Sequence, residues 1–340
     1  MKSLQNNIMT EFKGKTILIT GGTGSIGLGI VKQLVNCKPK AIRIFANDEN
    51  SIFETRRTIG DNPLFKYMVG DVRDKDRLSL AIRNVDIVFH AAAMKHIDIC
   101  EQNPFDAVKT NVIGTSNVLE AAIIEKVSKF IFISTDKATN PTSTLGASKL
   151  LAERLTLDAS SYNENGKTIF AIARFGNVIG SRGSVFQIFY HNLRNGNPLI
   201  ITDARMTRFI MSISEAASMI LQMTSITKDG EIFILKMPSV KISDLAGAMV
   251  DVYKDRYPNL KKVSTIKIST IREHERFHEL LVTSEEIPYC HDIGNMYKIS
   301  KTENKQKPPT AQFNSETASK ISKEKLHNSI NELLDEYVSY

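Results

Sequence analysis

This sequence has few cysteines and no long apolar run. Its three cysteines, Cys37, Cys100 and Cys290, are scattered, odd in number and without the spacing of metal ligands. This pattern excludes a disulfide framework and fits a reducing compartment. No apolar run is long enough to cross a bilayer, and the first residues are polar, unlike a signal peptide. We therefore expect a cytoplasmic protein with no membrane partner and no metal site.

A concentrated charge of one sign is lacking as well. The formal net charge is +7 at pH 7, and basic residues are spread along the whole chain. A nucleic-acid-binding stripe is one interpretation, but a surface that attracts a small phosphorylated ligand fits at least as well. We expect no nucleic-acid partner. A chain of 340 residues with an ordinary apolar fraction suffices for one large α/β unit or two modest domains.

The most informative stretch is a strand that runs into a glycine-rich turn, Lys15 to Gly27. A short branched apolar run indicates a buried parallel strand, and a helical pattern follows from Ile26 to Val35. Glycines between them let a pyrophosphate approach the N–H groups at a helix N-terminus. Because strand and helix flank the turn as this mechanism requires, we predict a dinucleotide site rather than an ordinary glycine-rich turn. Its predicted residues are Gly21, Thr23, Gly24, Ser25, Ile26 and Gly27.

Further strands alternate with helices along the first half of the chain. They are expected at residues 41–45, 65–69, 86–90, 130–134 and 169–174. Such βα repetition predicts an α/β fold with a right-handed, doubly wound parallel sheet. A ligand then lies outside the carboxyl ends of the strands.

Acidic residues follow the second and third strands. Asp48 lies about twenty residues beyond the last glycine, where a carboxylate can bond the adenosine ribose. Asp71, followed by Val72, can hold the adenine amino group. Helix capping is the alternative for both carboxylates. Arg56 and Arg57, one short helix beyond Asp48, could instead favour a 2′-phosphate, so the choice between NAD and NADP stays open.

The fourth and fifth strands end in residues that suit a cofactor and a reaction. Ala91 and Ala92 leave room for a flat cofactor. Thr135, Asp136 and Lys137 follow the fifth strand directly and are expected at the site. A polar, glycine-rich loop, residues 175–184, is suited to meeting a ligand.

The predicted domains follow from this rhythm. Residues 1–13 are expected to be a loose leader, and residues 14–184 a dinucleotide-binding domain. Residues 185–300 mainly form a smaller α/β substrate domain, of which some segments can return to the first sheet. A linker at 301–320 and an amphipathic helix at 321–340 complete the chain.

Several motifs resemble one protein superfamily. They are Ser134-Thr-Asp-Lys137, Gly146-Ala-Ser-Lys149, His90-Ala-Ala-Ala-Met-Lys95, Arg174-Phe-Gly-Asn177 and Ile201-Thr-Asp-Ala-Arg205-Met-Thr-Arg208. Over about residues 14–290 the chain resembles the extended short-chain dehydrogenases/reductases. More narrowly, it resembles inverting UDP-N-acetylglucosamine 4,6-dehydratases and capsule polysaccharide biosynthesis proteins. The resemblance implies a Rossmann fold, bound NADP (with NAD as the alternative) and a UDP-N-acetylhexosamine substrate. We also expect a homo-oligomer.

The implied reaction gives roles to the residues after the fifth strand. A hydride leaves C4 of the hexose, the resulting ketone acidifies the C5 proton, water leaves from C6 and the hydride returns there. The resemblance implies that Lys137 is the base at C5, Asp136 the acid for the C6 hydroxyl and Thr135 a partner of O4. It also implies that Lys149 holds the nicotinamide ribose. An Asp136–Lys149 surface pair that caps a helix is the structural alternative.

One position departs from the superfamily's Tyr-x-x-x-Lys pair. Leu145 stands where the tyrosine is expected, four residues before Lys149, and leucine exchanges no proton. Neutral Lys149, Lys137, Asp136 or a held water could deprotonate the C4 hydroxyl instead.

The substrate residues implied by the resemblance lie largely in the second half of the chain. Arginine forks match diphosphate oxygens, and surface ion pairs are the alternative role. The predicted set is Lys95, Asn177, Arg182, Arg205, Arg208, Glu275 and His278.

Three other functions remain as alternatives. His274-Glu275-Arg276-Phe277-His278 would be a zinc-protease signature if it were helical, but no third ligand follows at the usual spacing. A UDP-sugar 4-epimerase or a dehydratase/5-epimerase would share the first oxidation. A non-catalytic nucleotide-binding protein would keep the fold and lose turnover with the tyrosine.

Overall fold

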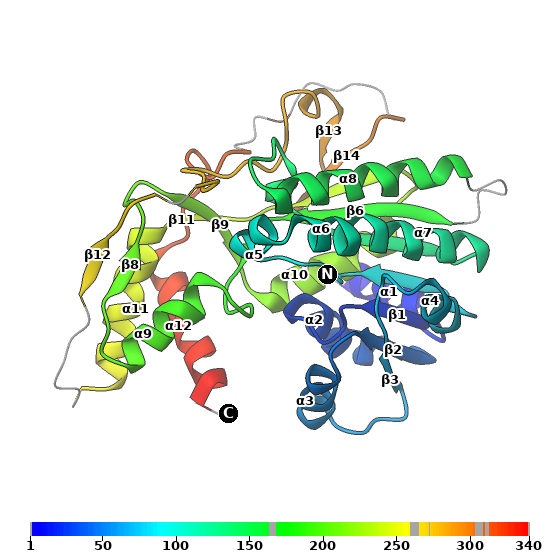
Figure 1. Ribbon diagram of the computed structural model, residues 1–340, viewed down its shortest axis with the longest axis horizontal. Coiled ribbons are helices and arrows are strands. Elements are labelled where there is room, and N and C mark those ends of the chain that lie inside the picture. The colour runs from blue at the N-terminus through cyan, green and yellow to red at the C-terminus, as the bar shows by residue number, and fades with distance from the viewer. Residues whose placement is uncertain are drawn as a thin grey trace. The chain divides into compact units, whose positions relative to one another are not determined.

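A computed structural model describes residues 2–162, 168–258, 265–271, 273–302, 309 and 313–338 (Figure 1). The chain forms two compact units. The first contains Met1–Phe175, Ser214–Lys236 and Val282–Pro309, and the second contains Gly176–Ile213, Met237–Leu281 and Thr310–Tyr340. The boundary therefore follows Phe175 rather than residue 184, and parts of 185–300 belong to the first unit.

The first unit is built on a nine-stranded sheet of order β13-β14-β10-β6-β5-β4-β1-β2-β3. Its strands are β1 Thr16–Thr20, β2 Ala41–Ala46, β3 Phe65–Val69, β4 Ile87–His90, β5 Lys129–Thr135, β6 Ile169–Phe175, β10 Glu231–Leu235, β13 Cys290–Asp292 and β14 Met296–Ile299. Strands β1 to β6 and β10 pair in parallel, and β14 pairs antiparallel with both neighbours. This confirms the predicted doubly wound parallel sheet.

Helices cover both faces of this sheet. They are α1 Lys2–Phe12, α2 Ser25–Leu34, α3 Glu49–Ile59, α4 Lys75–Ile82, α5 Ile97–Gln102, α6 Pro104–Ala107, α7 Gly114–Ile124, α8 Thr144–Asp158 and α10 Ile213–Ile226, with a π-helical turn, η2, at Val108–Ile113. The strand order reverses between β1 and β4, so right-handed connections put α2 and α3 on one face and α4, α7 and α8 on the other. Strand β1 is buried along its whole length, as its apolar run predicts.

The N-terminal segment differs from the sequence-based expectation. Residues 1–13 were expected to be a loose leader, but α1 is a helix whose last residue, Phe12, is fully buried. Phe12 packs near Phe89, with ring centroids 6.2 Å apart, and Glu11 pairs with Lys129 of β5 at 2.9 Å. The Phe12 ring and the Glu11–Lys129 ion pair hold the segment against the sheet. The polar composition of the segment gave no indication of these contacts.

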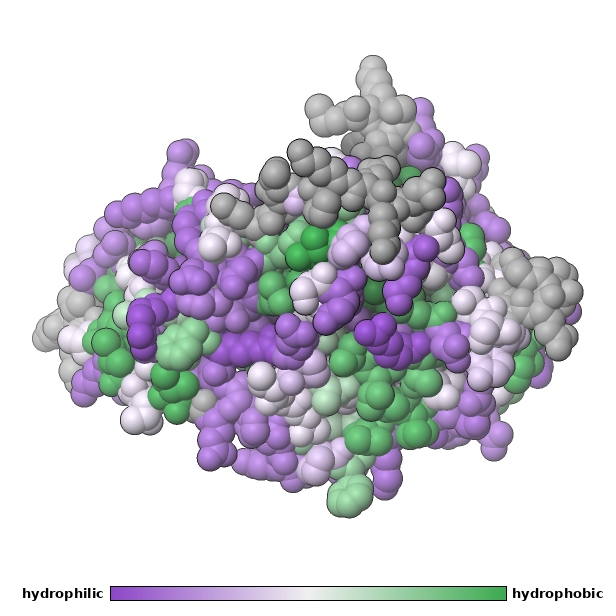
Figure 2. All heavy atoms as spheres, turned by 90° about the horizontal axis from the view of Figure 1, so that it is seen from above, coloured by the Kyte–Doolittle hydropathy of each residue, from purple (hydrophilic) through white to green (hydrophobic). Residues whose placement is uncertain are grey.

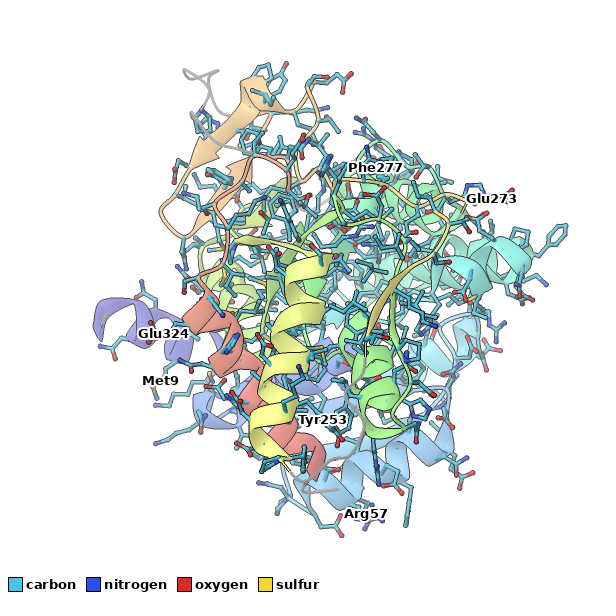
Figure 3. The ribbon with its side chains drawn as sticks, turned by 90° about the vertical axis from the view of Figure 1, so that its left-hand side faces the viewer. Met9, Arg57, Tyr253, Glu273, Phe277 and Glu324 are labelled. Atoms are coloured by element: carbon cyan, nitrogen blue, oxygen red, sulfur yellow. The ribbon has the colours of Figure 1, made fainter. Side chains whose placement is uncertain are left out.

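The second unit combines two small sheets with three helices. The sheets have the orders β11-β9-β7 and β12-β8. The elements are β7 Asn177–Val178, α9 Val185–Arg194, β8 Leu199–Ile201, β9 Thr207–Met211, β11 Ser239–Lys241, α11 Ile242–Arg256, β12 Ile266–Ile268 and α12 Lys323–Val338. Helices α11 and α12 lie side by side, and Tyr253 of α11 belongs to the core that they share (Figure 3).

The final helix supports the loop that follows β7. Gly180 has a φ of +73°, and a side chain there would meet Leu333 of α12 at 2.3 Å. The predicted C-terminal helix is thus present, beginning at Lys323. Of the predicted linker, residues 303–308 and 310–312 lie outside the described residues.

Polar residues cover much of the face seen in Figure 2, with smaller apolar areas between them. Within the described residues, none of the helices combines the length and the apolar character needed to cross a membrane.

Candidate functional site

In the glycine turn after β1, backbone atoms of neighbouring residues occupy the space that side chains would need. Gly21 has a φ of +65°, and a Cβ there would lie 2.7 Å from the Ala92 nitrogen. A Cβ on Gly27 would lie 2.3 Å from the Gly21 oxygen, so α2 packs directly on the turn. Gly24 is the N-cap of α2 and brings no side chain to that end. The turn therefore fits a pyrophosphate at the helix N-terminus.

The polar residues of the turn join it to the next strand end. The Thr23 and Ser51 hydroxyls lie 3.0 Å apart, and the Ser51 hydroxyl donates to the Asp48 carbonyl at 2.8 Å. Asp48 caps α3, because its carboxylate accepts the N–H groups of Asn50 and Ser51 at 3.1 and 3.2 Å. The capping alternative for Asp48 is confirmed, and its contact with a ribose stays a prediction.

Helix capping, the alternative role predicted for Asp71, is not the role that Asp71 has in the structure. The N-cap of α4 is Asp74, so Asp71 does not cap that helix. Asp71 instead takes a fork from Arg73 at 2.7 and 2.9 Å, and this contact holds the pKa of its carboxyl below its ordinary value. Val72 beside it is buried.

His90 ends β4, just before Ala91 and Ala92, and no role was predicted for it beyond its place in a motif. Its Nδ1 lies 2.6 Å from the Thr20 hydroxyl, and its Nε2 lies 3.0 Å from the Thr115 hydroxyl. Because Thr115 donates to the Asn111 carbonyl at 2.6 Å, it accepts from His90, which fixes the Nε2–H tautomer. Burial, aided by Lys149, lowers the pKa of His90 to about 3. A neutral imidazole thus ties β1, β4 and α7 together below the turn.

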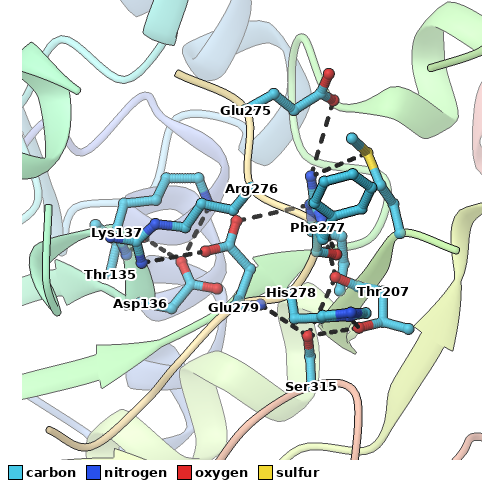
Figure 4. A network of polar contacts seen from close by, with 12 residues as sticks. Thr135, Asp136, Lys137, Thr207, Glu275, Arg276, Phe277, His278, Glu279 and Ser315 are labelled. Atoms are coloured by element: carbon cyan, nitrogen blue, oxygen red, sulfur yellow. Dashed lines mark hydrogen bonds and ion pairs between the residues drawn. The ribbon is translucent and has the colours of Figure 1, made fainter. Parts of the chain in front are cut away.

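The most reactive arrangement lies at the carboxyl end of β5. Asp136 is completely buried, and its Oδ1 accepts hydrogen bonds from the Thr135 hydroxyl at 2.9 Å and from Lys137 Nζ at 3.0 Å (Figure 4). In the described part of the chain its Oδ2 has no hydrogen-bond partner. A buried carboxylate oxygen without a partner is costly unless it serves a ligand or a reaction.

Lys149 reaches the same strand from α8. Its Nζ donates to the Ile133 carbonyl at 2.6 Å and lies 3.9 Å from the centre of the Phe132 ring. Burial lowers the pKa of Lys149 to about 7, although Glu153 opposes this shift. Both Lys149 and Asp136 are buried and have other partners, so the interpretation as an Asp136–Lys149 surface pair was wrong.

Glu153, Arg174 and Glu286 form a buried ionic network next to the end of β5, which the sequence did not predict. Glu153 accepts the Ser134 hydroxyl at 2.6 Å and the Arg174 guanidinium at 2.6 and 3.0 Å. Arg174 also donates twice to Glu286, each time at 2.8 Å. The spacing of Lys149 and Glu153, four residues apart on one helix, was the available signal.

Leu145 lies in an apolar cluster. It is buried with Cys100 and Ala107, and Met94 and Ile97 pack against them. The position expected for a tyrosine is therefore apolar in its surroundings as well as in its own side chain.

The second unit contains a pocket that gathers several predicted substrate residues. Its cavity volume is about 30 Å³, and Asn177, Ser184 and Arg208 line it together with apolar residues of β9, α9 and α11. The Asn177 Oδ1 and Ser184 Oγ atoms are buried, and the described residues offer neither a hydrogen-bond partner. Arg208 donates to the carbonyls of Thr207 and Phe277 at 2.8 and 3.2 Å. Ser184 was missed as an individual residue, although its loop was predicted to meet a ligand.

Three further predicted substrate residues, Lys95, Arg182 and Arg205, are exposed. Arg205 forks onto Asp203 at 2.7 and 2.9 Å and lies over the Phe277 ring at 4.8 Å. The ion-pair alternative is present at Arg205, and Arg208, which lines the pocket with Asn177, also lies 3.8 Å from Glu275 and 3.6 Å from Glu279.

Residues 273–279 form turns rather than a helix, and His274 has a φ of +64°. The zinc-protease spacing therefore does not place two histidines on one helical face. His278 Nδ1 lies 2.8 Å from the Thr207 hydroxyl, which in turn lies 2.7 Å from Ser315 Oγ (Figure 4). Glu275 pairs with Arg208 at 3.8 Å. These contacts bind the segment to Thr207 and Arg208 of β9. No group of three potential metal ligands is found among the residues described.

A family model described as polysaccharide biosynthesis protein matches residues 17–301. The chain belongs to this polysaccharide biosynthesis protein family of extended short-chain dehydrogenases/reductases. An uncharacterized membrane protein of Methanocaldococcus jannaschii is 46% identical over 96% of this chain and 98% of its own length. An inverting UDP-N-acetylglucosamine 4,6-dehydratase of Campylobacter jejuni is 44% identical over 85% of this chain and 84% of its own.

Two further similarities complete the comparison. A UDP-glucose 4-epimerase of Rickettsia bellii is 39% identical over 85% of this chain and 83% of its own length. The X-ray structure of Pen from Bacillus thuringiensis superimposes with a TM-score of 0.88 at 38% identity, covering 94% of this chain and 98% of that one. The family member described here therefore belongs to the class of nucleotide-sugar dehydratases and epimerases, which are enzymes.

Proposed function

We propose that this protein is a UDP-N-acetylhexosamine 4,6-dehydratase, C5-inverting, that makes a UDP-4-keto-6-deoxy sugar for a surface glycan. The observation that supports the proposal is the fully buried Asp136, with one carboxylate oxygen bonded to Thr135 and Lys137 and the other without a hydrogen-bond partner among the described residues. An elimination needs a base and an acid close together, and a plain 4-epimerase needs neither at C5 and C6.

A nicotinamide dinucleotide fits the first unit. The backbone of Gly21, Gly24 and Gly27 would cradle its pyrophosphate, and Lys149 would hold the nicotinamide ribose. Asp48, Asp71, Val72, Ala91 and Ala92 stand at the neighbouring strand ends, as the adenosine half requires. A nicotinamide bound here would supply the acceptor for the C4 hydride and its return to C6, while the proton of the C4 hydroxyl passes to one of the groups named for it above, Lys149, Lys137, Asp136 or a held water.

The Asp136–Lys137 pair can supply base and acid in one step. Transfer of one proton from Nζ to Oδ1 across 3.0 Å converts the ion pair into a neutral amine and a neutral carboxylic acid. Lys137 then takes the C5 proton, Asp136 gives its proton to the departing C6 hydroxyl, and water leaves. The two side chains end as the ion pair from which they began, so the protons balance.

In the second unit, Asn177, Ser184 and Arg208, the polar residues that line the small pocket, are the groups proposed to contact the UDP diphosphate. Lys95, Arg182, Arg205, Glu275 and His278 stay in the proposed substrate set. A cytoplasmic location and a homo-oligomer also stay predictions.

The test is incubation with UDP-N-acetylglucosamine in heavy water, followed by NMR. We expect a 4-keto-6-deoxy sugar with deuterium at C5, and a loss of about 10²-fold or more in rate for Asp136→Asn and for Lys137→Met. Asp158→Asn, an exposed aspartate at the end of α8, is the matched control and should keep the rate.

A 4-epimerase is the second candidate, because a relative of 39% identity carries that name. Inversion at C4 with no deuterium at C5, unaffected by Lys137→Met, would establish this alternative in place of the dehydratase.

A further inference from the structure

The edge of the sheet formed by β2 and β3 determines which dinucleotide the first unit can hold. In a doubly wound sheet, the adenosine ribose lies at the end of the strand after the glycine turn. Here β1 and β2 pair in register from Thr16↔Ala41 to Thr20↔Phe45, and the Gly22 nitrogen donates to the Phe45 carbonyl at 3.2 Å. The residues that would meet the ribose are therefore those just after Ala46.

That strand end is acidic. Asn47, Asp48 and Glu49 are all exposed, and residues 46–51 contain no cation. Both oxygens of Asp48 are fixed by backbone N–H groups of α3, which keeps this carboxylate at the strand end. Asp71, at the end of the neighbouring strand β3, adds a third carboxylate and accepts a hydrogen bond from the Asn47 side chain.

The arginines that could neutralise a 2′-phosphate are engaged elsewhere. Arg56 forks onto Asp61 at 2.6 and 2.9 Å, and Arg57 pairs with Glu54 at 3.0 Å. Both lie in the last turn of α3, about 10 Å along the helix from the strand end, and Arg57 is at the outer surface (Figure 3).

The two arginines that follow β3 also have hydrogen-bond partners. Arg73 forks onto Asp71 and approaches Asp106 at 3.7 Å. Arg77 donates to the Val69 carbonyl at 2.8 Å and lies over the Phe45 ring at 5.7 Å. Each guanidinium is bound to a carboxylate or to the strand backbone.

We infer that the protein prefers NAD over NADP, with the acidic β2 end (Asp48 and Glu49, backed by Asp71) as the determinant. This inference rests on the dinucleotide site of the proposed function, and it replaces the expectation of NADP. A ribose 2′-hydroxyl donates to a carboxylate, whereas a 2′-phosphate would bring about two negative charges next to the carboxylates of Asp48 and Glu49, and Arg73, the guanidinium bonded at this strand end, is already paired with Asp71.

The first experiment identifies and titrates the nucleotide. Nucleotide released by acid from the purified protein is identified by mass, and NADH and NADPH are then titrated by fluorescence into nucleotide-free protein. We expect NAD to be released and NADH to bind about tenfold or more tightly than NADPH. Release of NADP, or binding of NADPH as tight as that of NADH, would overturn the inference.

Variants locate the determinant. Asp48→Asn keeps a capping side chain and removes a charge, so the preference for NADH should narrow. Asn47→Arg combined with Asp48→Asn should reverse it. Arg57→Ala is the matched control and should leave both affinities unchanged, whereas a selective loss of NADPH binding in this variant would contradict the assignment.

The outcomes separate this inference from the proposed function. If NAD is bound and no 4-keto-6-deoxy sugar forms, the inference stands and the dehydratase fails. If only protein loaded with NADP makes the product, the dehydratase stands and the inference fails. If neither nucleotide binds, both fail.

Discussion

Each unit contains an arginine between two glutamates, and the two sites differ in how tightly they are bonded. Arg174 in the first unit donates to Glu153 and Glu286 at 2.6 to 3.0 Å, and its side chain is 2% exposed. Arg208 in the second unit approaches Glu275 and Glu279 only to 3.8 and 3.6 Å and is 12% exposed. The composition of the two sites is the same, and the geometry is not.

The difference separates a structural ion network from the site that we propose for the diphosphate. Arg174 directs its fork at carboxylates on both sides and raises its own pKa through them, although burial opposes this. Its contacts with Glu286 hold the pKa of that carboxyl below its ordinary value despite burial. Arg208 donates from Nη1 to two carbonyls, and its contacts with carboxylates are long. Its pocket also contains two buried oxygens, Asn177 Oδ1 and Ser184 Oγ, that have no hydrogen-bond partner in the described part of the chain. A phosphate bound at Arg208 can form shorter contacts with the guanidinium than the two carboxylates do. At Arg174 the guanidinium is already bonded to carboxylates on both sides.

The largest expected effect is that of Arg174→Met on stability. Removing the cation leaves two carboxylates buried without compensation, so the free energy of unfolding should fall by about 3–5 kcal/mol. Urea or thermal unfolding measures this loss. The control is Arg205→Met, which removes an exposed pair and should leave the unfolding curve unchanged. A stability loss as small as that of the control would show that the buried network is not a structural anchor.

Arg208→Met should act mainly on binding. If Arg208 serves a diphosphate, calorimetric titration with UDP should show an affinity reduced by about 10- to 100-fold, because a charge-assisted hydrogen bond is lost. Its stability loss should be smaller than that of Arg174→Met. An unchanged UDP affinity with a stability loss equal to that of Arg174→Met would remove the distinction between the two sites.

Residues fixed by local pattern were accessible from the sequence. The βα rhythm located the sheet, and its strand ends led to Asp136 and Lys137 because parallel strands place their carboxyl ends at one edge. Lys149, on helix α8, was predicted only from the resemblance. Glu286 has no such signal, since it reaches Arg174 across 112 residues. The same holds for Ser315 and Thr207, which are 108 residues apart. Helix α1 was missed because its docking depends on single contacts, Phe12 and Glu11, rather than on an apolar periodicity.

The smallest expected effect is the change that Glu153→Gln makes in the pH dependence of stability, which links the Arg174 network to Lys149. Burial lowers the pKa of folded Lys149 to about 7, whereas in the unfolded chain it stays near its ordinary value of 10.5. Between these values the unfolded state binds more protons, so the free energy of unfolding rises with pH from about 7 towards 10. Lys149→Met should lose this rise when unfolding is measured across the same pH range. Glu153→Gln removes the neighbouring negative charge that favours the ammonium, so the rise should begin at a lower pH than in the unaltered protein. If it began at the same pH, the network would not act on Lys149 through charge, and its influence on the strand end would be limited to the Ser134 hydrogen bond.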